Sequence, residues 1–251
     1  MNFEYQETGF VYKKALFGPH ELEEIRGILN TFHKQWTEEN KEIFFSQAVN
    51  SSGITGRRFL DTTSRLTLFN FISSPKLMAL VEDIIPHKPC FMNSQLFFNP
   101  HNPQQKNYWH RDPQYHLSLE EQKHALRGPT VLHLRIALQD EPGIELVPGS
   151  HTRWDSSEEL DVRLERNNRH CFEDLIDTKI FSLDAGDVLL FSGNMIHRGL
   201  YGMDRFALDI LVCDPEEHLV AFAVEECLPS KEEQLKIGDP SLFRNTLSLR
   251  K

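Results

Sequence analysis

The sequence lacks any long run of apolar residues. None of its hydrophobic stretches reaches the roughly 18 to 20 residues that a membrane-spanning helix needs, although 39% of the 251 residues are hydrophobic. The first five residues contain neither the basic segment nor the apolar segment of a secretory signal. We therefore expect a cytoplasmic protein that has no membrane partner.

Clusters of positive charge are missing as well. The chain carries 27 Lys and Arg residues against 37 Asp and Glu residues, and its formal net charge is -10. Proteins that bind a phosphate backbone concentrate Lys and Arg on one surface or along one helix. We therefore expect no nucleic-acid partner.

Cysteine is scarce, and repeats and low-complexity tracts are absent. The four cysteines form no Cys-x-x-Cys pair, so we expect free thiols rather than a zinc knuckle or a redox dithiol. The remaining composition is that of an ordinary globular enzyme. The length allows one large domain or two small ones, and we favour a single domain over residues 1–251.

Residues 1–89 are predicted to form a mainly helical N-terminal support. Residues 19–35 repeat apolar side chains at three- and four-residue spacing, which is typical of an amphipathic helix. A second helix is predicted to begin after Ser74 with Pro75 in its first turn, and to end at Pro86. Both apolar stripes should pack on a flat surface.

Residues 90–213 change to short apolar runs, each bounded by Pro, Gly, Asn or Asp. The runs are 91–98, 131–138, 144–147, 179–183, 187–191 and 205–213. Such runs are typical of strands in an antiparallel sandwich or barrel. Residues 152–177 are polar and are predicted to form a surface insertion with some helix, a candidate lid. Residues 214–251 form a C-terminal extension to which the sequence assigns no chemistry.

A candidate metal site lies in the segment His110-Arg111-Asp112. Residues i and i+2 of an extended strand point to the same face, so His110 and Asp112 can share one metal ion. His197 follows the apolar run 187–191 and fits as a third ligand from another strand. Two imidazoles and one carboxylate leave three coordination positions open, as in non-heme Fe(II) oxygenases. Hydrolytic zinc fits this pattern less well.

Arg205 is the candidate for binding a carboxylate of an organic co-substrate. It begins the apolar run 205–211, where an arginine is costly to bury unless an anion pairs with it. 2-Oxoglutarate would chelate the iron through its keto acid end and would leave its other carboxylate in need of such a cation. The alternative is a surface arginine paired with Asp204.

The order of these motifs resembles that of the phytanoyl-CoA dioxygenase family. The motifs are His110-x-Asp112; Ala137-Leu138-x-Asp140 with Gly143; Leu146-Val147-Pro148-Gly149-Ser150-His151; Gly186-Asp187-x-Leu189-x-Phe191; His197; and Arg205. The likeness covers about residues 90 to 213, and Gly9-Phe10 before the helix at 19–35 is also similar. Several independent motifs in one order are more specific than any single one.

The resemblance implies a mainly β fold with flanking helices around a double-stranded β-helix, the jelly-roll or cupin-like core. It implies Fe(II) held by His110, Asp112 and His197, and 2-oxoglutarate bound through Arg205. Further contacts to the co-substrate or substrate fall on Gln95, Arg135 and Arg58. The implied activity is that of a dioxygenase, which uses dioxygen to hydroxylate an unactivated C–H bond of a small organic substrate and releases succinate and CO2.

Several positions depart from the family pattern. Arg135 stands where many relatives have an aromatic residue, Asn99 where they often have Lys, and Gly199 where a hydroxyl is frequent. These departures indicate that the organic substrate differs from an acyl-CoA. Because Asp112 keeps its carboxylate, hydroxylation is favoured over halogenation, whereas desaturation and ring formation stay open.

Two alternative functions and several histidines complete the sequence-based expectations. The barrel could bind a metal or small ligand without turnover, or the oxygenase could act on a protein side chain. Around the same strands lie four more histidines, of which one or two are expected to line the cavity: His101, His116, His124 and His133. Nothing in the sequence indicates the oligomeric state.

Overall fold

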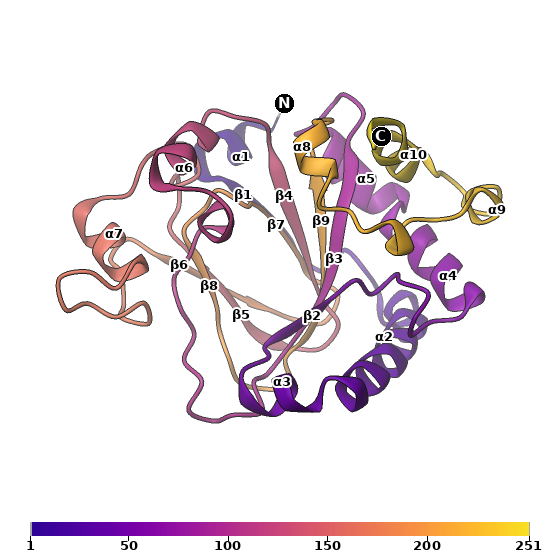
Figure 1. Cartoon of the computed structure of the whole chain (residues 1–251), viewed down its shortest axis with the longest axis horizontal. Coiled ribbons are helices and arrows are strands. Elements are labelled where there is room, and N and C mark those ends of the chain that lie inside the picture. The colour runs from indigo at the N-terminus through magenta and orange to yellow at the C-terminus, as the bar shows by residue number, and fades with distance from the viewer. Residues whose placement is uncertain (1, 251) are drawn as a thin grey trace.

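Two antiparallel β-sheets face each other in the computed structural model, which describes residues 2–250 (Figure 1). The major sheet contains, in spatial order, β1 (Phe10–Lys13), β7 (Val188–Ser192), β4 (Val131–Ala137), β9 (Phe206–Cys213), β3 (Cys90–Phe98) and β2 (Asn50–Ser52). The minor sheet contains β6 (Lys179–Leu183), β5 (Glu141–Leu146) and β8 (His197–Gly199). The predicted mainly β jelly-roll core with flanking helices is confirmed.

Strand β4 shows how the major sheet separates a packed face from a chemical face. Leu132, Leu134 and Ile136 belong to the large core that the helices share. The alternating residues His133 and Arg135 point to the other side, into the space between the sheets, and line a cavity there. Alternation along one strand therefore places hydrophobic packing and buried polar groups back to back.

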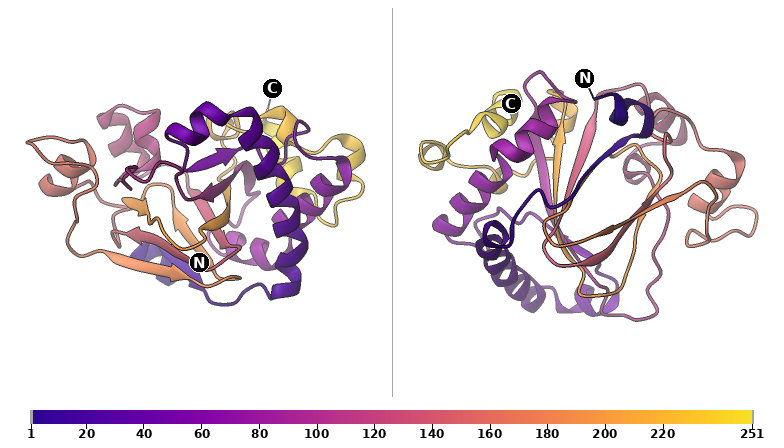
Figure 2. Two further views of the ribbon diagram at one scale, coloured as in Figure 1. Left: turned by 90° about the horizontal axis from the view of Figure 1, so that it is seen from below. Right: turned by 180° about the vertical axis from the view of Figure 1, so that it is seen from behind.

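Helices cover the outer face of the major sheet, and the two ends of the chain contribute to the same layer (Figure 2). The α-helices are α1 (Phe3–Thr8), α2 (Pro19–Glu39), α3 (Lys41–Ser46), α4 (Thr62–Ile72), α5 (Pro75–Glu82), α6 (Leu119–Ala125), α7 (Ser157–Arg163), α8 (Glu217–Val220), α9 (Lys231–Gln234) and α10 (Ser241–Leu249), with 3-10 turns η1 (Asp112–Tyr115) and η2 (Glu225–Cys227). Phe243 of α10 packs edge-on against Phe69 of α4, with ring centroids 5.0 Å apart. No helix within residues 2–250 has both the length and the apolar character to cross a membrane.

The N-terminal region is less purely helical than predicted, because it supplies two strands of the major sheet. Phe10 of β1 pairs with Phe191 of β7, and Ser51 of β2 pairs with Leu96 of β3. With four and three residues, these strands are too short for an alternating pattern to reveal them. Because β1 and β2 form the two edges of the six-stranded sheet, we propose that the chain folds as one domain.

Gly143 allows β5 to bulge beside the cavity. Its φ is +85°, and an added Cβ would lie 1.7 Å from the carbonyl oxygen of Phe181. We expect Gly143→Ala to lower the free energy of unfolding by more than about 2 kcal/mol, since alanine tolerates neither that backbone conformation nor the contact. Urea denaturation measures this change.

The matched control is Gly27→Ala on the outer face of α2. An added Cβ at Gly27 meets no atom within 4 Å, so alanine should raise the free energy of unfolding by about 0.5 to 1 kcal/mol through its helix propensity. Equal midpoints for the two variants would contradict the role given to Gly143.

Candidate metal centre

The three predicted ligands come from two chain segments joined by a single β-bridge. His110 and His197 exchange backbone hydrogen bonds of 3.0 and 2.9 Å, and Asp112 begins the turn η1. Arg111 between them has an extended backbone, with φ -117° and ψ 137°, so the side chains on either side of it point the same way. One donor atom from each of His110, Asp112 and His197 lies within 4.8 Å of the other two.

Backbone carbonyls orient both imidazoles. The Nδ1 atom of His110 lies 3.2 Å from the carbonyl oxygen of Tyr108, and that of His197 lies 3.0 Å from the carbonyl oxygen of Met195. Each Nδ1 can therefore donate its proton to a carbonyl, which leaves the lone pair on Nε2 free for a metal. The two Nε2 atoms face Oδ1 of Asp112 at 3.6 and 3.7 Å.

The side chain of Arg111 points away from the ligands and ties their segment to the insertion. Its guanidinium donates to Asp155 at 2.8 Å and to the carbonyl oxygens of Ser150, at 2.7 Å, and Asn194. Arg163 of α7 binds the other oxygen of Asp155 at 2.9 Å. All three charged side chains are buried, so the insertion is anchored through charge pairs directly behind the metal site.

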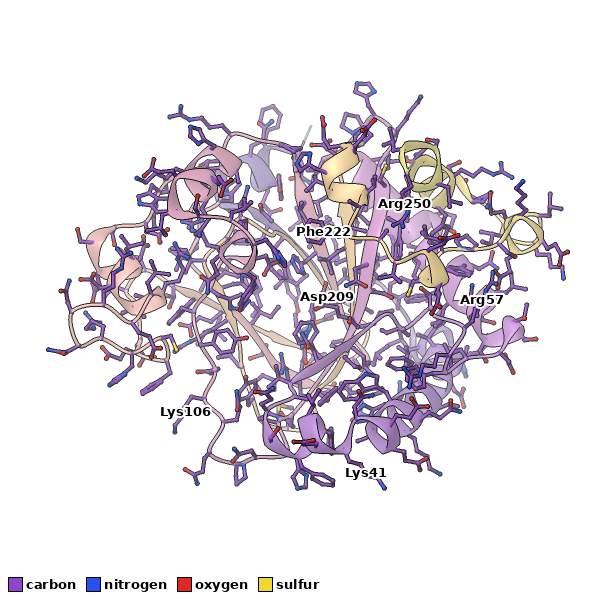
Figure 3. All side chains as sticks on the ribbon, viewed as in Figure 1. Lys41, Arg57, Lys106, Asp209, Phe222 and Arg250 are labelled. Atoms are coloured by element: carbon purple, nitrogen blue, oxygen red, sulfur yellow. The ribbon has the colours of Figure 1, made fainter. Side chains whose placement is uncertain are left out.

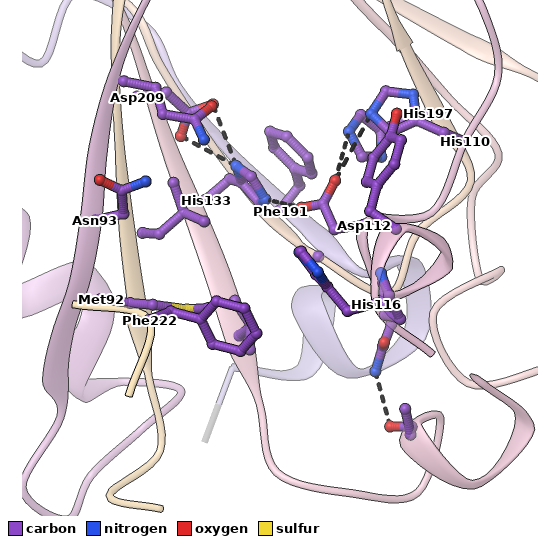
Figure 4. Close-up of a pocket in the computed structure, with 18 of the residues that line it drawn as sticks. Met92, Asn93, His110, Asp112, His116, His133, Phe191, His197, Asp209 and Phe222 are labelled. Atoms are coloured by element: carbon purple, nitrogen blue, oxygen red, sulfur yellow. Dashed lines mark hydrogen bonds and ion pairs between the residues drawn. The ribbon is translucent and has the colours of Figure 1, made fainter. Parts of the chain in front are cut away.

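His133 holds the second oxygen of Asp112 (Figure 4). Its Nε2 makes a short hydrogen bond with Oδ2 of Asp112, and its Nδ1 lies 3.1 Å from Oδ1 of Asp209. The imidazole also stacks on Phe191, with centroids 4.7 Å apart and planes at 10°. This arrangement keeps Oδ1 of Asp112 turned toward the two ligand histidines.

The charge states of these groups suit a metal site. Burial lowers the pKa of His110 and that of His197, the latter to about 3, and repulsion from His110 adds to the lowering at His197. Burial alone would raise the pKa of Asp112, but the surrounding imidazoles lower it far below its ordinary value. Burial would also lower the pKa of His133, but Asp209 and Asp112 raise it to about 10. Neutral imidazoles and an ionised carboxylate are the forms that bind metals.

A buried pair of arginines lies at one end of the cavity, against a single carboxylate. Arg135 makes a bidentate pair with Glu141 at 3.0 and 2.8 Å, and Arg205 approaches the same carboxylate at 3.7 Å. Arg205 Nη1 donates to the carbonyl oxygen of Phe98 at 3.1 Å, whereas its Nε has no hydrogen-bond partner among the described residues. Burial, followed by repulsion from Arg135, lowers the pKa of Arg205 to about 9.

Gly199 makes room for this arginine. A Cβ at position 199 would lie 2.5 Å from Nη2 of Arg205. The departure from the family pattern at this position is therefore matched to the packing of Arg205. The alternative prediction, a surface Arg205 paired with Asp204, does not fit the structure, because Arg205 is buried and only 3% of the residue is exposed.

A cavity of about 740 Å³ joins the arginine pair to the three ligands. It is lined by six of the seven predicted site residues: His110, Asp112, His197, Gln95, Arg135 and Arg205. Arg58 lies outside it, with an exposed side chain that pairs with Glu39. Of the four additional histidines, all but His101 line the cavity. No described residue of the 152–177 insertion does so, which leaves the candidate lid away from the cavity wall.

Sequence reasoning did not single out Glu141 or Asp209. Asp209 lies in the middle of the apolar run 205–213, and it is 2% exposed in the structure. An acid in such a run must be paired when buried, so its position already signalled a buried partner, which is His133. Glu141 has no comparable signal, because its neighbours Asp140 and Pro142 mark a turn.

Comparisons with known proteins agree with this geometry. The family model described as phytanoyl-CoA dioxygenase matches residues 5–200. The fold is similar to AviO1 from Streptomyces viridochromogenes Tue57, at 18% identity and a TM-score of 0.59 over 84% of this chain and 92% of that one. Comparison with curated proteins gives no significant match.

Two further solved structures share the fold at low identity. One is HygX from Streptomyces hygroscopicus with nickel and 2-oxoglutarate bound, at 15% identity and a TM-score of 0.60 over 84% of each chain. The other is the non-heme alpha ketoglutarate dependent carbocyclase SnoK from nogalamycin biosynthesis, at 16% identity and a TM-score of 0.56 over 85% of this chain and 82% of that one. At such identities the likeness establishes the fold alone.

Proposed function

The chain belongs to the phytanoyl-CoA dioxygenase family, and from this we propose that it is an Fe(II)- and 2-oxoglutarate-dependent dioxygenase that hydroxylates a small organic molecule. The observation that carries the proposal is the convergence of two imidazole Nε2 atoms and one carboxylate oxygen in a cavity that also holds a buried arginine pair. We assign the metal to His110, Asp112 and His197.

The donor set fits Fe(II) in the manner of a facial triad. Two nitrogen donors and one carboxylate oxygen from one side leave positions on the opposite side open for other ligands. The iron, when bound, supplies the chemistry that couples decarboxylation of 2-oxoglutarate by dioxygen to oxidation of the substrate. The protein fixes the donors, since His110, His197 and Asp112 each have a hydrogen bond that sets their orientation.

The arginine pair fits the far carboxylate of 2-oxoglutarate. Arg135 and Arg205 together carry two positive charges against the single negative charge of Glu141, so one further carboxylate would balance them. The Nε of Arg205, which has no hydrogen-bond partner among the described residues, is a donor that an incoming anion can satisfy. We therefore assign Arg205 as the main contact, with Arg135 in support and Gln95 along the same wall.

The shape of the cavity favours a small organic substrate over a protein side chain. Its volume of about 740 Å³ lies within the roughly 300 to 1,000 Å³ of ordinary small-molecule sites. Retention of Asp112 as a metal ligand supports hydroxylation as the reaction. Ring formation is the second candidate, because SnoK, which has the same fold, is a carbocyclase.

We expect a weak visible charge-transfer band when Fe(II) and 2-oxoglutarate are added to the protein without oxygen. The band is expected because the proposed site holds the iron and the 2-oxoglutarate that chelates it together. Admission of dioxygen should then give succinate. Absorption spectroscopy and product analysis measure the two steps. Absence of the band would contradict the metal assignment, whereas a band without succinate, for any substrate tried, would favour a barrel that binds without turnover.

A further inference from the structure

The cavity continues beyond the metal ligands, away from the arginine pair. Along β9, Ala207 pairs with Phe97 and Asp209 pairs with Gln95 and Arg135 at the arginine end. Leu211 pairs with Asn93 and His133 toward the opposite end. We name this opposite end the α8 lobe. Its lining includes Met92, Asn93, His116, Leu211, Leu219 and Phe222.

A β-bulge shapes the inner wall of the α8 lobe. The register of β3 against β9 shifts between Phe91 and Asn93, and an extra residue at such a shift redirects side chains. As a result, the consecutive residues Met92 and Asn93 both line the cavity. Oδ1 of Asn93 accepts a hydrogen bond from the backbone of Ser94 at 2.8 Å. Its amide N–H groups donate to no other described residue and are free for a ligand.

The outer wall of the α8 lobe is made by the C-terminal extension, to which the sequence assigned no chemistry. Phe222, just beyond α8, contacts His116 from the segment after η1, with ring centroids 5.0 Å apart. Figure 4 shows both rings below Asp112, with His116 nearer to it than Phe222. Leu219 and Leu211 add apolar surface, so the lobe combines an apolar enclosure with the free amide of Asn93.

Permanent positive charge in the cavity is confined to the co-substrate end. Among the described residues that line the cavity, Arg135 and Arg205 are the only lysines or arginines, and the acids are Asp112, Asp209 and Glu121. His133 lies between the carboxylates of Asp209 and Asp112, whose two negative charges exceed the single positive charge that its ring can carry. In Figure 3, Lys41 and Lys106 lie toward the edge of the view, whereas Asp209 and Phe222 lie near its centre.

We propose that the α8 lobe binds the organic substrate, and that this substrate is a small amphipathic molecule without negative charge. This inference rests on the function proposed above. An anionic group in the lobe would lose water without gaining a cationic partner, and it would face Asp209 and Asp112. A neutral molecule meets no such penalty and can accept a hydrogen bond from Asn93 while its hydrocarbon part contacts Phe222. A cationic molecule cannot accept that bond but is attracted by the same two carboxylates.

Three probes with one carbon skeleton test the charge preference: cyclohexylmethanol, cyclohexylmethylamine and cyclohexanecarboxylate. Each is titrated anaerobically into the protein loaded with Fe(II) and 2-oxoglutarate at about pH 8, where a free imidazole is neutral. We expect the alcohol and the amine to shift the charge-transfer band with dissociation constants at least about tenfold lower than that of the carboxylate. A carboxylate that binds as tightly as the alcohol, or a band that no probe shifts, would overturn the proposal.

Two matched variants place the preference in the α8 lobe. Phe222 and Phe172 are 44% and 41% exposed, and each contacts a histidine, but only Phe222 lines the cavity. Phe222→Lys should improve carboxylate binding relative to the alcohol by about tenfold, and Phe172→Lys should leave the ratio unchanged. Equal ratios in the two variants would refute the assignment of the lobe. Failure of the band to form before any probe is added would instead contradict the proposed function itself.

Discussion

Replacement of Asp112 with alanine is expected to abolish the charge-transfer band and succinate formation. Loss of a group that only supports a ligand already weakens metal binding by about 10- to 100-fold, so loss of the carboxylate itself should weaken it by more than about 100-fold. The variant should still fold, because Asp112 is a partly exposed residue at the start of a short turn. Metal-dependent thermal stabilisation measures the affinity independently of turnover.

The control for this variant is Asp204→Ala, which removes an exposed acid outside the cavity lining. It should bind metal like the wild-type protein. Asp112→Asn, which preserves the size of the side chain, should behave like the alanine variant because the metal requires the negative charge. Wild-type metal affinity in both Asp112 variants would rule out the assigned triad.

Arg205→Met should raise the dissociation constant of 2-oxoglutarate by about 100-fold, because removal of one member of a buried charge pair commonly costs about 2 to 5 kcal/mol. Metal affinity should not change, since Arg205 contacts none of the three ligands. The fold should persist because Glu141 keeps its bidentate partner Arg135. Titration of the charge-transfer band with 2-oxoglutarate gives the constant directly.

Arg58→Met provides the matched control. The resemblance to the family offered Arg58 as a further contact, but its side chain is 70% exposed and pairs with Glu39. We expect 2-oxoglutarate affinity within about twofold of wild type, since exposed ion pairs contribute little. A loss in Arg58→Met equal to that in Arg205→Met would show that the arginine end of the cavity has been assigned wrongly.

The sequence was most informative where a strand is long and has a regular pattern. The run 179–183 coincides with β6, and 91–98 differs from β3 by one residue, because apolar runs bounded by turn residues leave few alternative registers. The family resemblance offered Gln95 and Arg135 as further contacts, and both line the cavity. The position of His197 after the apolar run 187–191 offered a third ligand 87 residues beyond His110, and the family resemblance made that choice specific.

The remaining features depend on contacts between distant segments. Edge strands β1 and β2 are recognisable only through their partners, since three or four residues carry no periodic signal. Glu141 has its role because it pairs with Arg135 and Arg205, and His133 has its role because it contacts Asp209. In each case the partners come from different segments of the chain. The sequence also suggested a lid in the insertion, where the structure instead shows buried ion pairs.

The setting of Arg111 limits how this site could be transplanted into another scaffold. A designer who copied only the segment His110-Arg111-Asp112 and His197 would carry over the guanidinium of Arg111 without the groups that bind it. In a host barrel without Asp155 and its surrounding carbonyls, that arginine would be a buried charge with no counterion. We would then expect the tripeptide to change conformation and lose the geometry of the ligands. The smallest segment that could be transferred is therefore the ligand segment together with the start of the insertion through α7. Any graft of the site must include this part of the surface insertion.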